Sequence, residues 1–396
     1  MTATDPIVIC SARRTPLGAF TGALASVPAP MLGATAIAAA LEDAGVDPTG
    51  VGEVLMGCVL PAGQGQAPAR QAARFAGLPD HVGATTVNKV CGSGMKAIMT
   101  AADLLSLGRA DLIVAGGMEA MSRAPHLLAA LRGGRKSGEA TLVDHMMHDG
   151  LEDAYEAGRS MGSFGKATAW EYGFTRKDQD AFAIETLERA QAALSSGAFE
   201  AEIAPVTVPE RKGDTHVFAD ERPGQLDSAK IPKLRPAFAE DGTITAASAS
   251  GNADGAAALV LAPMPVAEAL GLPVLARIAG QAAHAQAPDR YTTAPIPAIR
   301  KLLAQSGWKP DDVDLWEINE AFAVVAMAAA RDIGIPREKL NVNGGACALG
   351  HPIGATGARL VVTLLHALRA RGLSRGVASL CIGGGEATAV AIEIVT

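Results

Sequence analysis

The sequence predicts an α/β fold built from two related halves. Short apolar runs alternate with segments whose apolar residues recur at helical spacing, a pattern typical of strands covered by helices. One helical segment ends at Gly45, with Pro48 just beyond it, and a second ends at Gly307, with Pro310 at the same distance. Because the same punctuation returns in the same context, we infer a weak internal repeat of two α/β halves.

The first half is expected to hold three buried strands and two helices. Apolar runs at residues 6–12, 53–60 and 110–117 have the length and composition of strands. A helical pattern over residues 32–45 lies between the first two runs. A second, amphipathic helix is expected within residues 88–105, after a glycine-rich turn.

The second half repeats these features. A helical pattern over residues 298–307 is followed by a glycine-rich segment that begins at Asn343, and an apolar run at residues 376–385 predicts a strand. This last run and the run at residues 110–117 both end in glycines that are followed by a glutamate, Glu386 or Glu119. The shared ending supports the repeat.

A stretch of different character separates the halves. Residues 121–243 contain methionine and histidine clusters, charged segments and scattered prolines, with few clear buried strands. We interpret them as an insertion into a first half that spans residues 1–120 and is completed by about 244–272, and the second half spans 273–396. Within the insertion, residues 175–194 predict a helix that opens with a capping pattern.

Composition excludes several classes of protein. Hydrophobic residues make up 49% of the 396 residues and charged residues 19%, which describes a packed globule rather than a disordered chain. The net charge of −7 comes from 34 basic and 41 acidic side chains, so there is no basic surface to attract a phosphate backbone. Nucleic acid is therefore not an expected partner.

Cysteine content and the apolar runs point to the cytoplasm. Five cysteines are too few, and odd in number, for a disulfide framework, which favours a reducing compartment. The start, MTATDPIVIC, lacks the pattern of a secretory signal. The longest apolar run, residues 321–330, is shorter than the roughly 20 residues that span a bilayer. We expect a cytoplasmic protein with no membrane partner.

Cys91 is the first candidate for chemistry. It ends an apolar segment, and glycines and an amphipathic helix follow it. A thiol at a helix N-terminus lies near the positive end of the helix dipole, which favours the thiolate, so Cys91 is predicted to be a nucleophile. The alternative is a buried cysteine that acts only as a small hydrophobic residue.

Three further residues occupy settings that suit catalysis. His351 lies in a glycine-rich segment before a proline and could act as a general base. Cys381 ends an apolar run before three glycines, whose N–H groups could bind an oxyanion. Asn319 precedes a helical segment. Their alternatives are a structural histidine, a buried thiol beside a tight turn, and an ordinary helix cap.

A metal centre is not expected. Cys91, Cys347, His351 and Cys381 supply ligand types that zinc prefers, but no paired spacing of the kind found in zinc sites is present. The glycine-rich surroundings fit contacts to an acyl or phosphate group better. The short GATG and AGG sequences are not enough for a dinucleotide-binding motif.

Several motifs spread along essentially the whole chain together resemble the thiolase family, in particular its acetyl-CoA acetyltransferases. The motifs are ARRTPLGAF, LPAGQGQAPARQAA, VCGSGMKA, GGMEAMSRAP, RKGD, KLRPAF, NEAF, GGACALGHPIGATGAR and CIGGG. The resemblance implies a thiolase-like αβαβα sandwich of two duplicated five-stranded halves. It also implies that the inserted loop domain binds coenzyme A (CoA) and mediates the contacts of a homotetramer, a dimer of dimers.

The resemblance assigns a role to each catalytic candidate. Cys91 would accept an acetyl group from acetyl-CoA as a thioester, and His351 would take the proton of its thiol. Cys381 would remove an α-proton from a second acetyl-CoA, and the resulting carbanion would attack the acyl-enzyme to give acetoacetyl-CoA and CoA. One oxyanion site would combine His351 with a water held by Asn319, and the other the N–H groups of Cys91 and Gly383. No metal or organic cofactor is implied.

The resemblance also implies a set of residues that bind the substrate and CoA, namely Ser250, Met161, Arg222, Tyr291 and Phe322. The loop around Arg222 is one residue shorter than the common pattern. Three positions depart from the short-chain thiolases: Ser160 replaces a histidine, Lys166 a glutamate and Tyr291 a methionine.

Other functions remain as alternatives. Ser160 and Tyr291 favour a degradative 3-ketoacyl-CoA thiolase that accepts longer chains. A ketosynthase fits less well, because those enzymes typically use two histidines where this chain has His351 and Cys381. A catalytically silent CoA-binding or scaffold protein is disfavoured by the intact catalytic set. Cys10 and Cys58 are expected to be small strand residues, and the role of Cys347 stays open.

Overall fold

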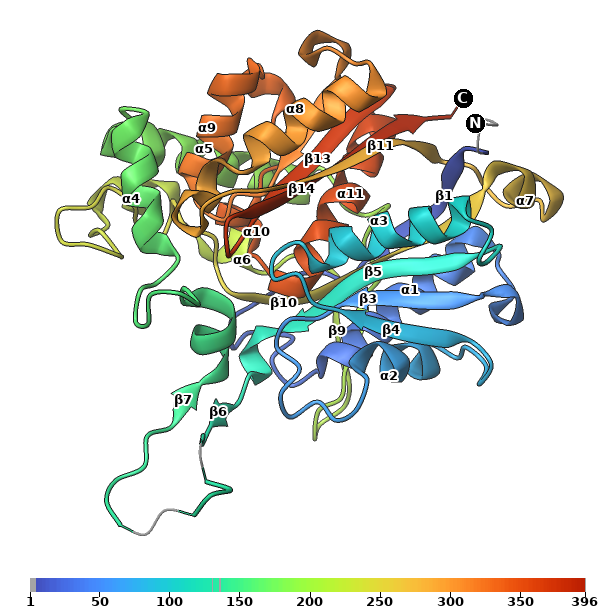
Figure 1. Cartoon of the computed structure of the whole chain (residues 1–396), viewed down its shortest axis with the longest axis horizontal. Helices are drawn as coiled ribbons and strands as arrows, with labels where there is room; N and C mark the ends of the chain where they lie inside the picture. The colour runs from blue at the N-terminus through green and yellow to red at the C-terminus, as the bar shows by residue number, and fades with distance from the viewer. Residues whose placement is uncertain (1–4, 130, 135–136, 396) are drawn as a thin grey trace.

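Five layers of secondary structure stack in the order helix, sheet, helix, sheet, helix (Figure 1). This architecture comes from a computed structural model that describes residues 5–129, 131–134 and 137–395. Helices α3 (Ser93–Ser106) and α11 (Ile353–Ala370) lie between the two sheets. Helices α1 (Ala29–Ala44) and α2 (Pro68–Phe75) cover the outer face of the first sheet. The layers confirm the predicted αβαβα sandwich.

The first half forms a five-stranded sheet in the order β4-β3-β5-β10-β1. Neighbours run parallel from β4 to β5 and antiparallel from β5 to β1. The bounds are β1 Ile7–Arg14, β3 Glu53–Gly57, β4 Gly83–Val87, β5 Ile113–Ala120 and β10 Ala253–Pro263, with the short β2 (Gly18–Ala19) beside β10 and helix α7 (Met264–Ala269) after it.

The second half follows the same pattern in the order β12-β13-β14-β11. Strands β12 and β13 are parallel, and the next two pairs are antiparallel. A single parallel bridge between Trp316 and Leu340 occupies the place of the fifth expected strand. The extended path ends there because the next residue, Asn341, has a φ of 47°. The bounds are β11 Ala276–Ala285, β12 Leu315–Ile318, β13 Arg375–Ile382, β14 Glu386–Ile394, α8 Pro295–Ser306, α9 Ala323–Ile333 and α10 Ala346–Leu349.

The internal repeat is visible in three dimensions. Gly45 caps the C-terminus of helix α1 and Gly307 that of helix α8, both in the left-handed conformation that glycine adopts without strain. A short 3-10 turn then leads into β3 or β12. The two sheets are joined where Val8 and Ile9 pair with the start of β11. The predicted domain boundaries remain predictions, since hydrogen bonding is continuous across the halves.

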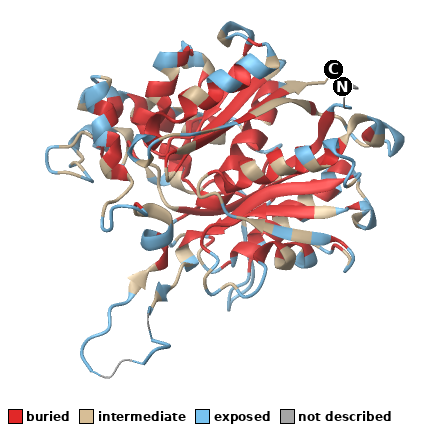
Figure 2. Ribbon diagram, in the orientation of Figure 1, coloured by how far each residue is buried: buried red, intermediate tan, exposed pale blue. Residues whose placement is uncertain are grey.

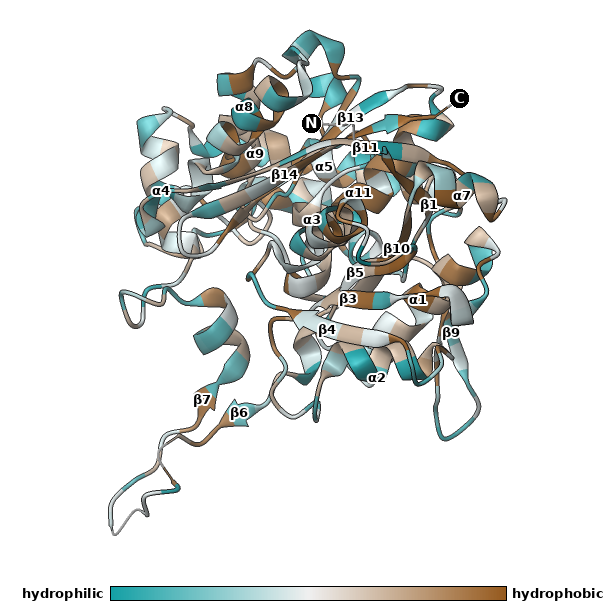
Figure 3. Ribbon diagram, turned by 45° about the vertical axis from the view of Figure 1, so that its right-hand side comes forward, coloured by the Kyte–Doolittle hydropathy of each residue, from teal (hydrophilic) through white to brown (hydrophobic). Residues whose placement is uncertain are grey.

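The core extends through both sheets and the central layer (Figure 2). Helix α11 is buried on nearly every side, because it packs against α3 and against strands of both sheets. The outer helix α2 carries hydrophilic residues while β1 and β10 are strongly hydrophobic (Figure 3). In a five-layer stack a central helix is buried on all sides, whereas an outer helix buries only the face that packs on its sheet.

The segment between β5 and β10 packs mainly over the second half. Its helix α5 (Arg176–Ser195) confirms the predicted helix, and Thr175 and Asp178 form its capping box. Strands β6 and β7, with the described residues between them, form an exposed projection that we call the arm (Figures 1 and 2). The remaining elements of this segment are β6 His126–Leu127, β7 Val143–Asp144, α4 Gly162–Glu171, β8 Val206–Val208, β9 Thr215–Val217 and α6 Arg222–Gln225.

Short helical turns complete the structure, namely Pro48–Gly50, Met121–Arg123, Met147–Leu151, Ser228–Lys233, Pro288–Thr293, Pro310–Asp312 and Arg337–Lys339. Among the helices that the structure describes, none is long and apolar enough to cross a membrane.

Candidate active site

A strained turn presents Cys91 at the start of α3. Val90, just before it, has a φ of 46°, a conformation that β-branched residues rarely adopt. The Val90 N–H donates to Oδ1 of Asn88 at 3.0 Å, and the Ser93 hydroxyl donates to the Val90 carbonyl at 2.6 Å. The same hydroxyl oxygen accepts the N–H of Lys89 at 2.8 Å. Side chains on both sides of Cys91 therefore hold the turn.

Glycines bring α3 and α11 into direct backbone contact. A Cβ on Gly94 would lie 2.9 Å from the Ala358 nitrogen, and a Cβ on Gly357 would lie 2.4 Å from the Met95 nitrogen. No side chain fits at either position without a shift of the backbone. The glycines in the GSG and GATG sequences thus bring the N-terminal ends of the two central helices together. Cys91 comes with one helix and His351 with the other.

The catalytic candidates open on one small cavity of about 50 Å³. Its walls come from both halves of the sandwich and from the segment between them, which contributes Gly150 and Leu151. Eight of the ten predicted site residues line the cavity, namely Cys91, His351, Cys381, Gly383, Ser250, Met161, Tyr291 and Phe322. Asn319 lies behind the wall, and its Nδ2 is 3.5 Å from Nε2 of His351.

The hydrogen bonds of His351 set its tautomer. Its Nδ1 is 2.6 Å from the Thr356 hydroxyl, and that hydroxyl donates to the Pro352 carbonyl at 2.9 Å. Since the single hydroxyl proton is used, Nδ1 must donate and Nε2 keeps its lone pair. Burial lowers the pKa of His351 to about 3, helped by the positive charge of Arg359. The imidazole is therefore neutral, and Nε2 can accept a proton.

Cys91 is a thiol in the resting protein, which corrects the expected thiolate. The residue is only partly buried, but its sulfur is enclosed by protein atoms. Burial raises the pKa of this thiol to about 11, and hydrogen bonds from the N–H groups of Gly383 and of Cys91 itself offset only part of the effect. Desolvation thus outweighs these two hydrogen bonds. Cys91 needs a base, and neutral His351 is the histidine that lines the same cavity.

Cys381 holds its proton even more strongly. Burial and the nearby sulfur of Cys91 raise the pKa of its thiol well above the usual value. It ends β13, and the turn that follows contains Gly384 and Gly385, both with positive φ. A Cβ on Gly385 would lie 2.3 Å from the Gln286 carbonyl, so the turn is closely packed. The N–H of Gly383 points from this turn toward Cys91.

A route leads from the small cavity to the surface. A neighbouring cavity of about 370 Å³ shares five lining residues with it, namely Leu151, Met161, Ser250, Phe322 and His351. Arg222, the tenth predicted site residue, lines this larger cavity, and so does Ser160. A third cavity, of about 270 Å³, lies on the other side of Arg222 and includes Lys230. The cavities together form a continuous path that ends at Cys91.

The comparisons with known proteins agree with this geometry. The family model described as "Thiolase, N-terminal domain" matches residues 7–264, and "Thiolase, C-terminal domain" matches residues 272–394. The chain belongs to the thiolase family.

Similar members of the family share one description. Acetyl-CoA acetyltransferase of Chromobacterium violaceum is 51% identical over 389 residues, which cover 98% of this thiolase and 99% of the relative. That of Cupriavidus necator is 52% identical over 391 residues, with the same coverage. The crystal structure of the Bacillus anthracis acetyl-CoA acetyltransferase superimposes with a TM-score of 0.96 at 40% identity and full coverage of both chains.

Residues that sequence reasoning missed support the catalytic loops of this thiolase. Glu119 accepts the N–H groups of Val59, Leu60 and Gly354 at 2.9, 3.1 and 2.9 Å. It thereby caps α11, whose N-cap residue, Pro352, has no side-chain cap. Burial raises the pKa of Glu119 to about 7. In the sequence, Glu119 is recognisable only as part of the glycine-and-glutamate ending that supports the internal repeat.

Glu320 has a similar supporting role beside Asn319. Its carboxylate accepts the Thr186 hydroxyl of α5 at 2.9 Å, the amide of Asn341 at 2.7 Å and the N–H of Cys347 at 3.2 Å. These bonds tie the segment that leads to His351 to the segment between the halves. Only the NEAF motif could have signalled this role, and it carries no information on the partners.

The three remaining cysteines lie outside the catalytic cavity. Cys347 lines the third cavity, and its thiol donates to the Glu320 carbonyl at 3.6 Å. Cys10 is buried in β1, and the Cys58 thiol donates to Glu119 at 3.6 Å just beyond β3. Burial raises the pKa of all three thiols, as it does for Cys91 and Cys381, but none of the three lines the cavity that contains His351.

The departures from the short-chain pattern have different consequences. The hydroxyl of Tyr291 donates to the Met161 carbonyl at 2.9 Å, and its ring packs edge-on against Phe164. Tyr291 thus forms part of the wall of the small cavity and is held in place. Lys166 makes an exposed ion pair with Asp241 at 2.7 Å, away from the catalytic cavity.

Proposed function

We propose that this thiolase is an acetyl-CoA C-acetyltransferase, which joins two molecules of acetyl-CoA to give acetoacetyl-CoA and CoA and also runs in reverse. The observation that carries the proposal is the convergence of a buried thiol, a neutral imidazole and a second thiol on one small cavity at the end of a long route. Curated relatives about half identical over nearly the whole chain carry the same description.

In the first half-reaction, Cys91 attacks the thioester carbonyl of acetyl-CoA while Nε2 of His351 takes the thiol proton. The sulfur–carbon bond to Cys91 forms and the bond to CoA breaks. The departing CoA sulfur takes the thiol proton of Cys381, which lines the same cavity, while His351 holds the proton of Cys91. Negative charge that develops on the carbonyl oxygen would be stabilised by the N–H groups of Cys91 and Gly383.

In the second half-reaction, a new acetyl-CoA loses an α-proton to the Cys381 thiolate that the first half-reaction left. The carbanion attacks the acetyl group on Cys91, the sulfur–carbon bond of Cys91 breaks, and Cys91 recovers its proton from His351. Asn319 supports the oxyanion site of this step through a water, because its Oδ1 has no partner among the described residues. In the cleavage direction, the strongly held proton of Cys381 is the one returned to the carbanion. These steps transfer acyl groups and protons but no electrons, so we propose that the reaction uses no cofactor.

The larger cavity is proposed to hold the pantetheine arm of CoA, against Ser250, Met161 and Phe322. Arg222, at the junction with the third cavity, would contact the phosphates. We further propose a cytoplasmic homotetramer whose partners are CoA and its acetyl and acetoacetyl thioesters.

The small volume beside Tyr291 favours acetyl over longer acyl groups. The test is thiolysis of acetoacetyl-CoA by the purified protein, compared with eight-carbon and sixteen-carbon 3-ketoacyl-CoA. We expect cleavage of the four-carbon substrate, little of the longer ones, and none by C91A. Absence of thiolysis by the wild type, or full activity in C91A, would contradict the proposal, and equal cleavage of all three would favour the broader degradative enzyme.

A further inference from the structure

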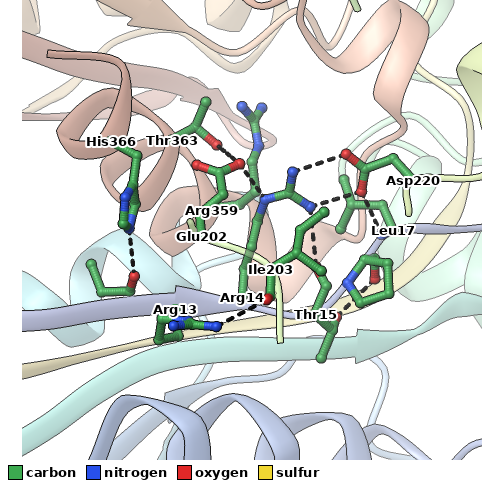
Figure 4. A network of polar contacts seen from close by, with 12 residues as sticks. Arg13, Arg14, Thr15, Leu17, Glu202, Ile203, Asp220, Arg359, Thr363 and His366 are labelled. Atoms are coloured by element: carbon green, nitrogen blue, oxygen red, sulfur yellow. Dashed lines mark hydrogen bonds and ion pairs between the residues drawn. The ribbon is translucent and has the colours of Figure 1, made fainter. Parts of the chain in front are cut away.

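A fully buried arginine joins the first strand to the segment between the halves. Arg14 of β1 contacts two carboxylates from that segment (Figure 4). Its Nη1 and Nη2 donate to the two oxygens of Asp220 at 2.7 and 2.9 Å, and its Nε donates to Glu202 at 2.7 Å. Buried ion pairs often add little stability compared with apolar residues of similar size. The precise geometry of this one therefore points to a role in positioning.

The chain on both sides of this contact is tied down. The N–H of Leu17 donates to Asp220 at 2.8 Å, and the next residue, Glu221, donates its own N–H to the Leu17 carbonyl at 3.0 Å. The Glu221 carboxylate accepts the N–H groups of Ala19 and Ala23, both at 2.9 Å. These hydrogen bonds form a clamp that holds residues 220–221 against the segment that follows β1. Arg14 lies at the centre of this clamp.

The residue that immediately follows the clamp is Arg222. Its guanidinium lies on the backbone of Gly251, where a Cβ would come 2.1 Å from Nη1. Its Nη2 donates to the Cys347 carbonyl at 3.3 Å, and its Nε has no partner among the described residues. The side chain borders both outer cavities. The Gly251 carbonyl in turn accepts the N–H of His351 at 2.8 Å.

We propose that Arg14 is a positioning residue for CoA: through Asp220 it fixes the short segment that carries Arg222 and so places a guanidinium where the phosphates of CoA bind. This inference rests on the proposed function. The two-residue spacing between Asp220 and Arg222 makes the link direct, because a shift of the Asp220 backbone moves the base of the Arg222 side chain.

The main test compares CoA with a thiol that has no phosphates. Thiolysis is measured with acetoacetyl-CoA and CoA, and again with acetoacetyl-pantetheine and pantetheine. Asp220→Asn has nearly the same volume but loses the two-point contact with Arg14. We expect it to raise the KM for acetoacetyl-CoA about 10-fold, as expected for a weakened charge-assisted contact, with kcat little changed. The pantetheine reaction should not change.

A double-mutant comparison tests the route through Arg222. Arg222→Gln alone should raise the KM for acetoacetyl-CoA, and adding D220N should raise it no further, because both changes disturb the same contact. Independent, multiplicative effects would show that Asp220 acts elsewhere and would overturn the inference. Arg13→Gln is the matched control, since the neighbouring Arg13 contacts Asp43 and the Ile203 carbonyl but not residues 220–222. Its KM should equal that of the wild type.

The outcomes separate this inference from the proposed function. A wild type without thiolysis overturns the function itself. An active wild type whose D220N variant has an unchanged KM, or loses the CoA and pantetheine reactions equally, overturns the positioning role alone. If D220N does not fold, Arg14→Lys keeps the charge without the two-point geometry, and the same selective rise in KM for acetoacetyl-CoA is required.

Discussion

Burial decides the protonation states at the catalytic cavity. Cys91 and Cys381 keep their protons because a thiolate would lose its hydration there, and His351 stays neutral for the same reason. Because these groups carry no net charge, the resting site accepts an acyl chain more readily than it would if Cys91 and His351 formed an ion pair. In the proposed mechanism we therefore expect the proton of Cys91 to move to His351 only when the thioester is in place.

Thr356 is expected to control the tautomer of His351. In Thr356→Val the shape is kept but Nδ1 loses its acceptor, so Nε2 is no longer held as the base. We expect kcat to fall roughly 10-fold or more with little change in KM, measured in acetoacetyl-CoA thiolysis. Thr35→Val is the control, because the Thr35 hydroxyl also bonds the carbonyl four residues earlier but contacts no histidine. Equal kcat values in the wild type and T356V would contradict this role.

His351 should also leave a signature in stability. Its pKa is about 3 in the folded chain against an ordinary value of 6.5, so between these pH values the unfolded chain binds a proton that the folded chain does not. The free energy of unfolding should therefore fall as pH drops below 6.5. In His351→Asn this contribution is absent, and the slopes of the two curves should differ by up to about 1.4 kcal/mol per pH unit. Parallel denaturation curves would refute the shift.

The sequence predicted the candidate residues that the structure brings together, but not their electrostatics. Cys91, His351 and Cys381 stand in glycine-rich turns that motif spacing reveals. The expectation of a thiolate at Cys91 was wrong, because its pKa depends on burial by segments distant in sequence. Thr356 and Glu119 could not be identified as partners, since their contacts arise only when α11 packs against its neighbours.

Among the elements, helices with clear end signals were the easiest to predict. Gly45, Gly307 and the capping box of α5 mark helix ends through local conformation alone. Strand limits depend on tertiary partners: the run expected over residues 53–60 stops at Gly57, because the N–H groups of Val59 and Leu60 donate to Glu119 instead of a strand.

The contact between α3 and α11 is expected to tolerate no added side chain. Gly357→Ala would place a Cβ 2.4 Å from the Met95 nitrogen and force the two helices apart. We expect a loss of about 3 kcal/mol in unfolding free energy, the upper end for overpacking, together with a loss of thiolysis. Gly50→Ala, where a Cβ meets no atom within 4 Å, serves as the control in the same denaturation experiment. A G357A protein as stable and active as G50A would contradict the close packing.

At the scale of the whole molecule, the arm stands out as an exposed projection. Three leucines near it, Leu128, Leu131 and Leu142, are exposed by 40%, 54% and 61%. Exposed apolar side chains gathered on a projection are typical of an assembly contact. They support the proposed tetramer, in which the arm would meet other subunits.

Light scattering on the eluting protein tests this assembly. The wild type should have four times the mass of one chain, and a variant with Leu128, Leu131 and Leu142 all changed to serine should have a smaller mass. Leu107→Ser, which alters a leucine that is 70% exposed at the C-terminal end of α3 and outside the arm, should remain a tetramer. A triple variant of unchanged mass would exclude the arm as the contact.

The position of β10 has a consequence for synthesis of the protein. This strand lies between β1 and β5, yet it spans Ala253–Pro263 and so leaves the ribosome long after both neighbours. Until then the first sheet has a gap between β5 and β1. Arg14 also lacks both of its carboxylates until residues 202 and 220 have been made. A nascent chain of 120 residues therefore cannot close its sheet, and stable folding of the first half must wait until about two thirds of the protein has been translated.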